Sequence, residues 1–420
     1  MVDTDENFGQ MANRLLVLDD QKEFAEVIAT IAKDLGYAAQ CVVDFDEFRR
    51  MLVAFNATHI VLDLNMPGTD GVEVMRFLES VQCTAKIILV SGFDRQVLNT
   101  AAQLGRERNL SIVGVFEKPF GLSRFREALL AAKQRATASV ADLELAIEQN
   151  QIRPYFQPKA LLGDDSIWQL DSFEILARWQ HPKFGIIMPG EFISVAERHG
   201  LISSLTDSIF NAALSESAET LKRYPYLSIA INISRNSLSD MGLPDRLAKC
   251  AARWGINASQ VTLELTESGT VDDAKNVMDI LTRLRLKHFL LSLDDFGTGF
   301  SSLIQLYRLP FSELKIDRSF VTELESSDEA RVIVEILVQL GQKLKLTTCA
   351  EGVETESTLQ RLSSLGCNKA QGFLFSPALP FAEVWNAVTD KSKGKWHVRD
   401  SAKPNSADIL GFARKENGQF

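Results

Sequence analysis

Short apolar segments that end in acidic residues recur along this 420-residue chain, with amphipathic helical stretches between them. Such segments are typical of buried parallel β-strands that alternate with helices. Parallel strands bring their carboxyl ends together, so polar residues far apart in the sequence should meet there. The repeat therefore indicates an α/β fold, and the length favours two or three domains of about 150 residues each.

The first four segments predict a doubly wound α/β domain over residues 13–133. They are RLLVLDD (14–20), HIVLDLNMPGTDG (59–71), KIILVSG (86–92) and IVGVFEKPF (112–120). In such a fold the polar residues at the strand ends share one edge of the sheet. Those residues are Asp19, Asp20, Asp63, Ser91 and Lys118. Each alone is more often part of a solvated turn, but the five in this order favour a site.

From the Asp-Asp pair through DLNMPGTDG to KPF, this domain resembles the CheY-like receiver domain of two-component response regulators. The resemblance implies that Asp63 accepts a phosphoryl group from a cognate sensor histidine kinase. It also implies one Mg²⁺ bound by Asp20, Asp63 and the carbonyl oxygen of Asn65, with Asp19 supporting the ion through water. A carboxylate attacks a phosphoanhydride-like donor only where a cation offsets the crowded negative charge.

The same resemblance implies roles for three more residues. Ser91 and Lys118 would contact the phosphoryl oxygens, and Phe116 would be the aromatic residue that switches with phosphorylation. Phosphorylation would draw Ser91 toward the new dianion and let Phe116 turn inward. A phosphorylation-dependent change at one face of the domain is therefore expected.

Residues 134–150 predict a helical linker, although ATASVAD (136–142) can interrupt it. Eight strand-like segments then predict a modified TIM-type (β/α)₈ barrel over residues 151–388. They are PYFQPK (154–159), SFEILARW (172–179), LSIAINIS (227–234), VTLELTES (261–268), FLLSLDDFG (289–297), ELKIDR (313–318), LTTCAEGVE (346–354) and CNKAQGFLF (367–375). The polar residues 389–420 predict a flexible tail.

Polar residues mark the strands of this second domain. They are Gln157, Glu174, Arg178, Asn232, Glu264, Asp294, Asp295, Lys315, Asp317, Glu351, Glu354 and Gln371. Strand ends of a barrel converge on one face, where this many carboxylates would repel one another unless cations neutralise them. Oxygen ligands without a His or Cys cluster favour Mg²⁺ or Mn²⁺ over zinc. Adjacent Asp294 and Asp295 can share two such ions.

Other function classes fit the sequence less well. Residues 295–297 spell the Asp-Phe-Gly of protein kinases, but no His-Arg-Asp loop or preceding lysine strand accompanies them. The Gly-Gly-Asp/Glu-Glu-Phe loop of diguanylate cyclases does not occur in the sequence. A formal net charge of −10 argues against nucleic acid polymers as partners, although a small phosphorylated ligand fits.

The sequence also predicts where the protein works. Its five cysteines have no Cys-x-x-Cys spacing and are expected to be reduced thiols in the cytoplasm. The first residues, MVDTDENFGQ, lack the basic and apolar regions of a secretory signal. No apolar run reaches the roughly 18 residues of a membrane span. A cytoplasmic protein without membrane insertion is expected.

Eight motifs of the second domain resemble the EAL family of cyclic di-GMP phosphodiesterases. They are FQPK, EILARW, NIS, LELTES, DDFGTGFSSL, KIDRSFV, AEGVET and QGFLFSPALP, in this order. One departure is Ile175, where the family's name motif has alanine. That position supplies no ligand, so a slight repacking is expected without loss of activity.

The resemblance implies two ions, Mg²⁺ or Mn²⁺. One would be bound by Glu174, Asn232, Glu264 and Asp294, and the other by Asp294, Asp295 and Glu354. Asp317 would lie in or just behind these ligands.

The resemblance also assigns the remaining residues. Lys315 would hold the attacking water or a phosphate oxygen, and Glu351 would be the general base. Substrate contacts would come from Gln157, Leu176, Arg178 and Gln371. Glu267 would steady the loop after the paired aspartates, which Gly297 and Gly299 make adaptable.

These roles imply a response regulator that hydrolyses cyclic di-GMP to linear 5'-pGpG by a two-metal mechanism, controlled by phosphorylation of Asp63. A homodimer or a higher oligomer is expected, with activation on phosphorylation. The alternative is a cyclic di-GMP receptor that binds the nucleotide without turnover. Receptors of this family usually lack metal ligands or the base, and no such residue is missing here.

Overall fold

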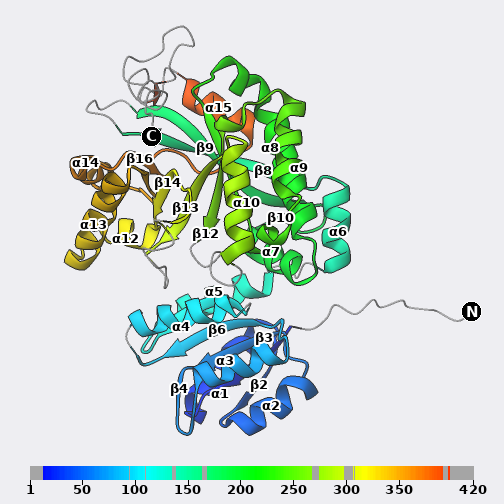
Figure 1. Ribbon diagram of the computed structural model, residues 1–420. Coiled ribbons are helices and arrows are strands. Elements are labelled where there is room, and N and C mark those ends of the chain that lie inside the picture. The colour runs from blue at the N-terminus through cyan, green and yellow to red at the C-terminus, as the bar shows by residue number, and fades with distance from the viewer. Residues whose placement is uncertain are drawn as a thin grey trace, which may run out of the picture. The chain divides into compact units, whose positions relative to one another are not determined.

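The computed structural model describes residues 13–93, 95–108, 110–134, 139–162, 168–266, 274–297, 306, 308–390 and 396–397. The chain forms two compact units, Met1–Thr137 and Ala138–Phe420. Figure 1 shows helices and strands in both of them. Among the described residues, no helix combines the length and the apolar character needed to cross a membrane.

The first unit is a doubly wound α/β domain, which confirms the predicted fold. Its five-stranded parallel sheet has the order β2-β1-β3-β6-β7. The elements are β1 (Arg14–Leu18), α1 (Lys22–Asp34), β2 (Ala38–Val42), α2 (Phe45–Ala54), β3 (His59–Asp63), β4 (Asn65–Met66), β5 (Thr69–Asp70), α3 (Gly71–Ser80), β6 (Lys86–Ser91), α4 (Arg95–Glu107), β7 (Ser111–Glu117) and α5 (Leu122–Gln134).

Helices cover both faces of this sheet. Alternate residues of β1 enter two different apolar cores, with Leu15 in one and Leu16 in the other. The first core includes residues of α1 and α5, and the second includes residues of α2, α3 and α4. Since side chains of a strand alternate between faces, one continuous apolar strand serves both cores.

The second unit is a barrel that shares its eight main strands with the sequence prediction. Its elements are α6 (Val140–Glu148), β8 (Ile152–Leu161), β9 (Trp168–His181), β10 (Gly185–Ile187), α7 (Pro189–Arg198), α8 (Ile202–Arg223), β11 (Ser228–Asn232), η1 (Arg235–Ser239), α9 (Leu243–Trp254), η2 (Ala258–Gln260), β12 (Val261–Thr266), α10 (Ala274–Leu286), β13 (Leu290–Phe296), β14 (Glu313–Ile316), α12 (Arg318–Thr322), α13 (Asp328–Leu344), β15 (Thr347–Ala350), α14 (Glu356–Leu365), β16 (Lys369–Gln371), α15 (Phe381–Thr389) and β17 (Trp396–His397).

The barrel closes through strand β8. The sheet runs β9-β11-β12-β13-β14-β15-β16-β8, and β8 pairs back with β9. The pairings from β9 through β16 in this order are parallel, whereas β8 is antiparallel to both of its neighbours. Figure 1 shows helices on both sides of the strands. The modified TIM-type barrel is confirmed, with one reversed strand.

The reversed strand changes how one predicted residue reaches the site. Gln157 was expected at the carboxyl end of a parallel strand, but it lies in the middle of β8 and pairs with Glu174 of β9. Alternating apolar and polar residues look the same in either strand direction. The sequence pattern therefore located the strand but did not give its direction.

Two further elements lie near the predicted domain boundaries. Helix α6 falls within the segment predicted as a helical linker; Ser139 caps it, and it packs against α7 and α8. Trp396 and His397 of the predicted tail form β17, which pairs with the first two residues of β9, Trp168 and Gln169. The boundaries at 133, 150 and 388 stay predictions.

Candidate functional site

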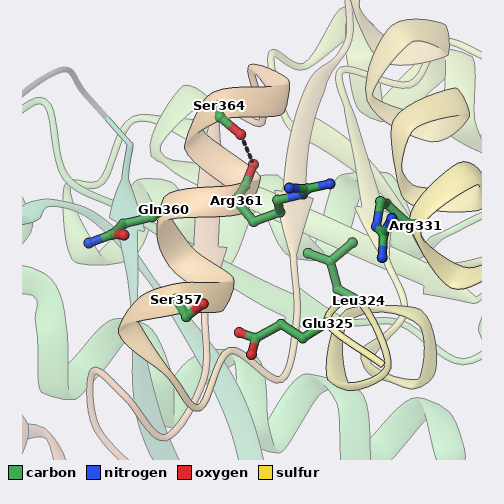
Figure 2. A pocket seen from close by; sticks show the side chains of 7 residues that line it. All are labelled: Leu324, Glu325, Arg331, Ser357, Gln360, Arg361 and Ser364. Atoms are coloured by element: carbon green, nitrogen blue, oxygen red, sulfur yellow. Dashed lines mark hydrogen bonds between the residues drawn. The ribbon is translucent and has the colours of Figure 1, made fainter. Parts of the chain in front are cut away.

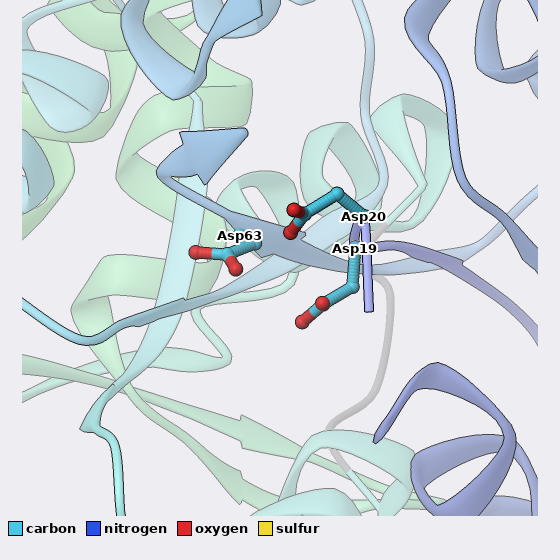
Figure 3. Close-up of side chains that lie close together, drawn as sticks. All are labelled: Asp19, Asp20 and Asp63. Carbon is cyan, nitrogen blue, oxygen red and sulfur yellow. The ribbon is translucent and has the colours of Figure 1, made fainter. Parts of the chain in front are cut away.

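Three acidic residues of the first unit gather where β1 and β3 end. Asp19, Asp20 and Asp63 each offer a carboxylate oxygen within 4.8 Å of the others. Figure 3 shows these three side chains close together. Lys118 Nζ lies 2.7 Å from Asp19 Oδ2 and 2.8 Å from Asp63 Oδ2. The structure thus brings one lysine and three acids together at the end of a parallel sheet.

This cluster fits a hard cation. Asp20 Oδ1 is buried without a hydrogen-bond partner among the described residues, while backbone N–H groups of Gln21 and Asn65 donate to Asp19 and Asp63. Burial raises the pKa of Asp19, although its contacts with Lys118 and with the Gln21 N–H lower it. An oxygen-only donor set suits Mg²⁺.

Two other predicted receiver residues lie on β6 and β7. Ser91 ends β6 and is buried, and its carbonyl oxygen accepts from the Lys118 N–H at 2.7 Å. Phe116 is also buried, with its ring centroid 5.2 Å from that of Phe120 and 5.1 Å from that of Phe125. Phe116 is thus packed in the core of the unit, and its role as a switch stays a prediction.

Lys315 occupies the centre of the barrel site. Its Nζ lies 3.0 Å from Glu264 Oε2, 3.0 Å from Asp294 Oδ2, 2.6 Å from Glu351 Oε1 and 3.5 Å from Glu174 Oε2. Strands β9, β12 and β13 carry three of these acids, and Glu351 follows β15. Residues from distant parts of the chain thus meet around one buried ammonium group.

Amide side chains orient Glu174. Asn232 Nδ2 donates to its Oε1 at 3.0 Å, and Gln371 Nε2 donates to its Oε2 at 2.6 Å. Gln371 Nε2 also donates to Gln157 Oε1 at 3.0 Å, whereas Gln371 Oε1 is buried without a partner among the described residues. Burial alone would raise the pKa of Glu174, but Lys315 and Lys159 lower it, which favours the carboxylate form.

Asp294, Asp295 and Glu351 form a second group of oxygen donors, all within 4.8 Å of one another. Strand alternation would send two consecutive aspartates to opposite sides, but Asp295 has a positive φ of 55° beside a register shift between Leu293 and Phe296. The left-handed residue breaks the alternation, which lets both carboxylates face the same group.

Uncompensated negative charge remains in this group. Burial, followed by the nearby Asp294 and Asp317 carboxylates, raises the pKa of Asp295 to about 7. Burial also raises the pKa of Glu351 well above its usual range, although Lys315 lowers it. Crowded acids with raised pKa values and oxygen donors fit divalent cations such as Mg²⁺ or Mn²⁺.

Some predicted residues lie outside these close contacts. Glu354 is exposed and does not belong to the Asp294–Asp295–Glu351 group, while Asp317 caps helix α12 by accepting from the Ser319 N–H at 2.9 Å. Glu351 lies beside the paired aspartates, and the roles predicted for Glu351 and Glu354 stay predictions. Among the remaining predicted positions, Glu267 and Gly299 lie outside the described residues.

The two remaining predicted substrate contacts come from β9. Arg178 and Leu176 are half-buried, and the Arg178 guanidinium lies 5.7 Å from the ring centroid of Tyr155. The Arg178 Nη1 group donates to the Ala177 carbonyl oxygen at 2.9 Å, so one of its N–H groups is already used within β9.

Three charged residues inside the barrel were present in the quoted motifs but were not assigned a role. Lys159, Glu313 and Lys369 are linked to one another and to Glu264 by ion pairs. Strand alternation provided a signal, since Lys159 lies two positions after Gln157, and Glu313 lies two positions before Lys315. Each therefore shares a strand face with a predicted site residue.

An open pocket elsewhere on the barrel unit has a different character. Figure 2 shows its lining by Leu324, Glu325, Arg331, Ser357, Gln360, Arg361 and Ser364. Glu325 Oε1 accepts from Thr355 Oγ1 at 3.1 Å and from Thr358 Oγ1 at 2.9 Å, which ties the start of α14 to the segment before α13. None of the converging site carboxylates lines it.

Comparisons with known proteins match both units of the chain. An EAL domain model matches residues 140–378, and a response regulator receiver domain model matches residues 15–130. The chain is 28% identical over 380 residues to the cyclic di-GMP phosphodiesterase RocR of Pseudomonas aeruginosa, covering 87% of this chain and 96% of RocR.

A second relative is more identical in sequence over a shorter stretch. The bifunctional diguanylate cyclase/cyclic di-GMP phosphodiesterase MucR of P. aeruginosa is 37% identical over 269 residues, covering 64% of this chain but 39% of MucR. The solved PaMucR phosphodiesterase in complex with c-di-GMP has a TM-score of 0.55 at 38% identity, covering 58% of this chain and 98% of that one. The chain therefore belongs to the EAL domain family and carries a response regulator receiver domain ahead of its EAL domain.

Proposed function

We propose that this chain is a response regulator that hydrolyses cyclic di-GMP to linear 5'-pGpG. The convergence of Glu174, Glu264, Asp294 and Glu351 on Lys315 carries the proposal. The similarity to RocR and to PaMucR, which are named as phosphodiesterases, supports it.

Two groups of residues would hold divalent cations. Glu174, Asn232, Glu264 and Asp294 would hold one, and Asp294, Asp295 and Glu354 would hold the other. When bound, two Mg²⁺ or Mn²⁺ ions would supply a water of lowered pKa and offset the charge of the phosphodiester. The donors are all carboxylate or amide oxygens, which hard cations prefer.

The chain's own residues would carry the proton and hold the reacting groups. Lys315 would fix the attacking water or a phosphate oxygen, and Glu351, 2.6 Å from Lys315 Nζ, would take a proton from that water. The water oxygen then bonds to phosphorus, the bond to the ribose 3' oxygen breaks, and the proton goes to that oxygen. One such step opens the ring and gives 5'-pGpG.

Substrate binding would use β8, β9 and β16. Arg178 offers the planar donor fork that suits a phosphate, and Leu176 would contact the nucleotide beside it. Gln157 of β8, the strand next to β9, and Gln371 of β16 would also contact the substrate, and a hydrogen bond of 3.0 Å joins these two side chains. The unpartnered Gln371 Oε1 supports a ligand contact there.

Control would come from the receiver domain. A sensor histidine kinase would phosphorylate Asp63, whose carboxylate Lys118 contacts at 2.8 Å, with one Mg²⁺ held by Asp20, Asp63 and the Asn65 carbonyl. Asp19 would support that ion through water. Phosphorylation would activate hydrolysis, and the working form would be a homodimer or a higher oligomer.

The test is incubation of the full chain with cyclic di-GMP and Mg²⁺ or Mn²⁺, followed by separation of the products. Formation of 5'-pGpG that disappears in Asp294→Asn is the expected result. Calcium should bind and inhibit, because its looser coordination orients the water poorly. Nucleotide binding without product by the metal-loaded wild type would instead identify a receptor.

A further inference from the structure

A chain of alternating charges continues from the site into the barrel interior. In order of contact its members are Lys315, Glu264, Lys159, Glu313, Lys369 and Asp171. Lys159 Nζ lies 2.5 Å from Glu264 Oε1 and 3.7 Å from Glu313 Oε1. Lys369 Nζ lies 3.0 Å from Glu313 Oε2 and 2.8 Å from Asp171 Oδ2. The series joins the candidate site to the opposite part of the barrel core.

The inner members of this series are withdrawn from water. The exposed fraction is 1% for Lys159, 0% for Glu264 and 6% for Glu313. A buried charge is tolerated only with partners close by, so each member depends on its neighbours. Ser292 Oγ adds a hydrogen bond of 3.1 Å to Glu313 Oε1. Glu313 is therefore held on several sides and forms a fixed support for Lys159.

Glu264 differs from the other proposed metal ligands because a separate lysine engages each of its oxygens. Lys159 engages Oε1, whereas Lys315 engages Oε2 on the side where Asp294 and Glu351 lie. Rotation of the carboxylate would break both contacts. With Oε1 held by Lys159, Oε2 is the oxygen presented to the site.

We propose that Lys159, supported by Glu313, is a positioning residue that fixes the orientation of the Glu264 carboxylate for metal binding. The inference rests on the proposed function and adds to it a residue that touches neither substrate nor the reacting water. Neighbours that orient metal ligands typically contribute about 10- to 100-fold to metal affinity or activity. If the series served only to stabilise the fold, removing Lys159 or Lys369 would change the metal affinity to the same extent.

The experiment compares Lys159→Met with Lys369→Met in the full chain. Both changes remove a lysine that contacts Glu313, but of these two lysines only Lys159, and not Lys369, reaches Glu264 in an ion pair among the described residues. Every sample also carries Asp20→Asn, which disables the receiver's metal site, so that Mn²⁺ binding reports on the barrel. Bound Mn²⁺ is measured by electron paramagnetic resonance without nucleotide, and kcat and KM for cyclic di-GMP are measured at several Mn²⁺ concentrations.

Lys159→Met should weaken Mn²⁺ binding by about 10- to 100-fold, with KM for cyclic di-GMP unchanged at saturating Mn²⁺. Lys369→Met should keep the reference Mn²⁺ affinity. If Lys159→Met does not fold, the double variant Lys159→Met/Glu313→Gln removes opposite charges together and should show the same weakening. Circular dichroism checks that each protein is folded.

Equal Mn²⁺ affinity in folded Lys159 and Lys369 variants would overturn the inference, as would equal losses in both. The Mn²⁺ measurement separates this result from a failure of the proposed function. A reference protein that binds Mn²⁺ but forms no 5'-pGpG contradicts the proposed hydrolase, yet the comparison of Lys159 with Lys369 still decides the positioning role. A reference protein that binds no Mn²⁺ overturns both.

Discussion

Glu351 is the side chain on which the proposed proton transfer depends. Changing it to glutamine keeps its size and removes the basic oxygen, so kcat should fall by about 10²- to 10⁴-fold. Binding of cyclic di-GMP in the presence of Ca²⁺ should remain, because Arg178, Gln157 and Gln371 are unchanged. Initial rates and titration calorimetry measure the two quantities.

The control for this variant is Glu335→Gln, which makes the same change on the exposed side of helix α13. It should behave like the wild type in both measurements. A Glu351→Gln protein that turns over at the wild-type rate would remove Glu351 from the mechanism.

His59 predicts a pH dependence of stability in the receiver unit. Its Nε2 donates to the Ala132 carbonyl at 3.1 Å and its Nδ1 accepts from Thr58 Oγ1 at 2.9 Å, an arrangement of the neutral ring. Burial lowers the pKa of His59 from the usual 6.5 to about 4, and Lys86 lowers it further, against the Ala132 bond. The unfolded chain therefore binds a proton between these two pH values that the folded unit does not bind.

The free energy of unfolding should thus fall as the pH decreases from about 6.5 to about 4, by about 3 kcal/mol from this group. His59→Gln should lack this part of the slope. All five tryptophans lie in the second unit, so tryptophan fluorescence assigns that unit's transition, and calorimetry measures the other one. Equal slopes in the two proteins would contradict the assignment to His59.

At the scale of elements, the loop after β15 depends on a close approach to the end of β16. A Cβ atom on Gly372 would lie 2.1 Å from the Val353 carbonyl oxygen, in the segment between Glu351 and Glu354. Gly372→Ala should therefore displace that segment, with a loss of about 1–3 kcal/mol in unfolding free energy. Turnover should also fall, since small misplacements of catalytic groups have large effects on rate.

Gly190→Ala is the matched control for this prediction. Gly190 lies in the first turn of α7, where an added Cβ would have no neighbour within 4 Å. Thermal unfolding and initial rates should be close to those of the wild type. If Gly372→Ala is equally mild, the close approach does not position the Glu351 segment.

The elements also show how far the sequence predicts this fold. The eight main barrel strands overlap the segments identified from apolar runs, because burial on both faces leaves a strong pattern. The buried partners of Glu264 were not predicted, because a charge in a core is stable only beside a partner from another strand. Lys159 and Glu264 are 105 positions apart, and no local pattern links them.

The sequence predicted that Asp294 and Asp295 share ions, but it did not predict the backbone conformation that brings their carboxylates together. Alternation predicts opposite directions for neighbouring residues of a regular strand. The positive φ of Asp295 and the register shift beside it depend on pairing between β13 and β14, which the local sequence does not specify. Strand positions were therefore more predictable than the directions of individual side chains.

At the scale of the whole molecule, the intact acidic cluster of the receiver predicts control of the barrel. Beryllofluoride, which mimics a phosphoryl group on Asp63, should raise the rate of cyclic di-GMP hydrolysis by about fivefold or more, as coupling energies between sites commonly allow. Initial rates and light-scattering mass are measured together. Asp63→Asn is the control and should respond in neither quantity.

A wild-type protein whose rate and mass both ignore beryllofluoride would mean that the receiver does not control the barrel. A lower rate would keep the coupling but reverse the proposed activation. Because a ligand shifts an equilibrium only through different affinities for its two states, either response would indicate at least two states of the molecule.

The ammonium group of Lys315 has a consequence for the life of the protein in a cell. It offsets part of the negative charge of Glu264, Asp294 and Glu351, so we expect the barrel to fold before any divalent ion binds. The ion would then bind to a barrel that is already folded. In a cell depleted of divalent ions, the protein would stay folded but inactive. Adding the ions back would restore activity without new protein synthesis.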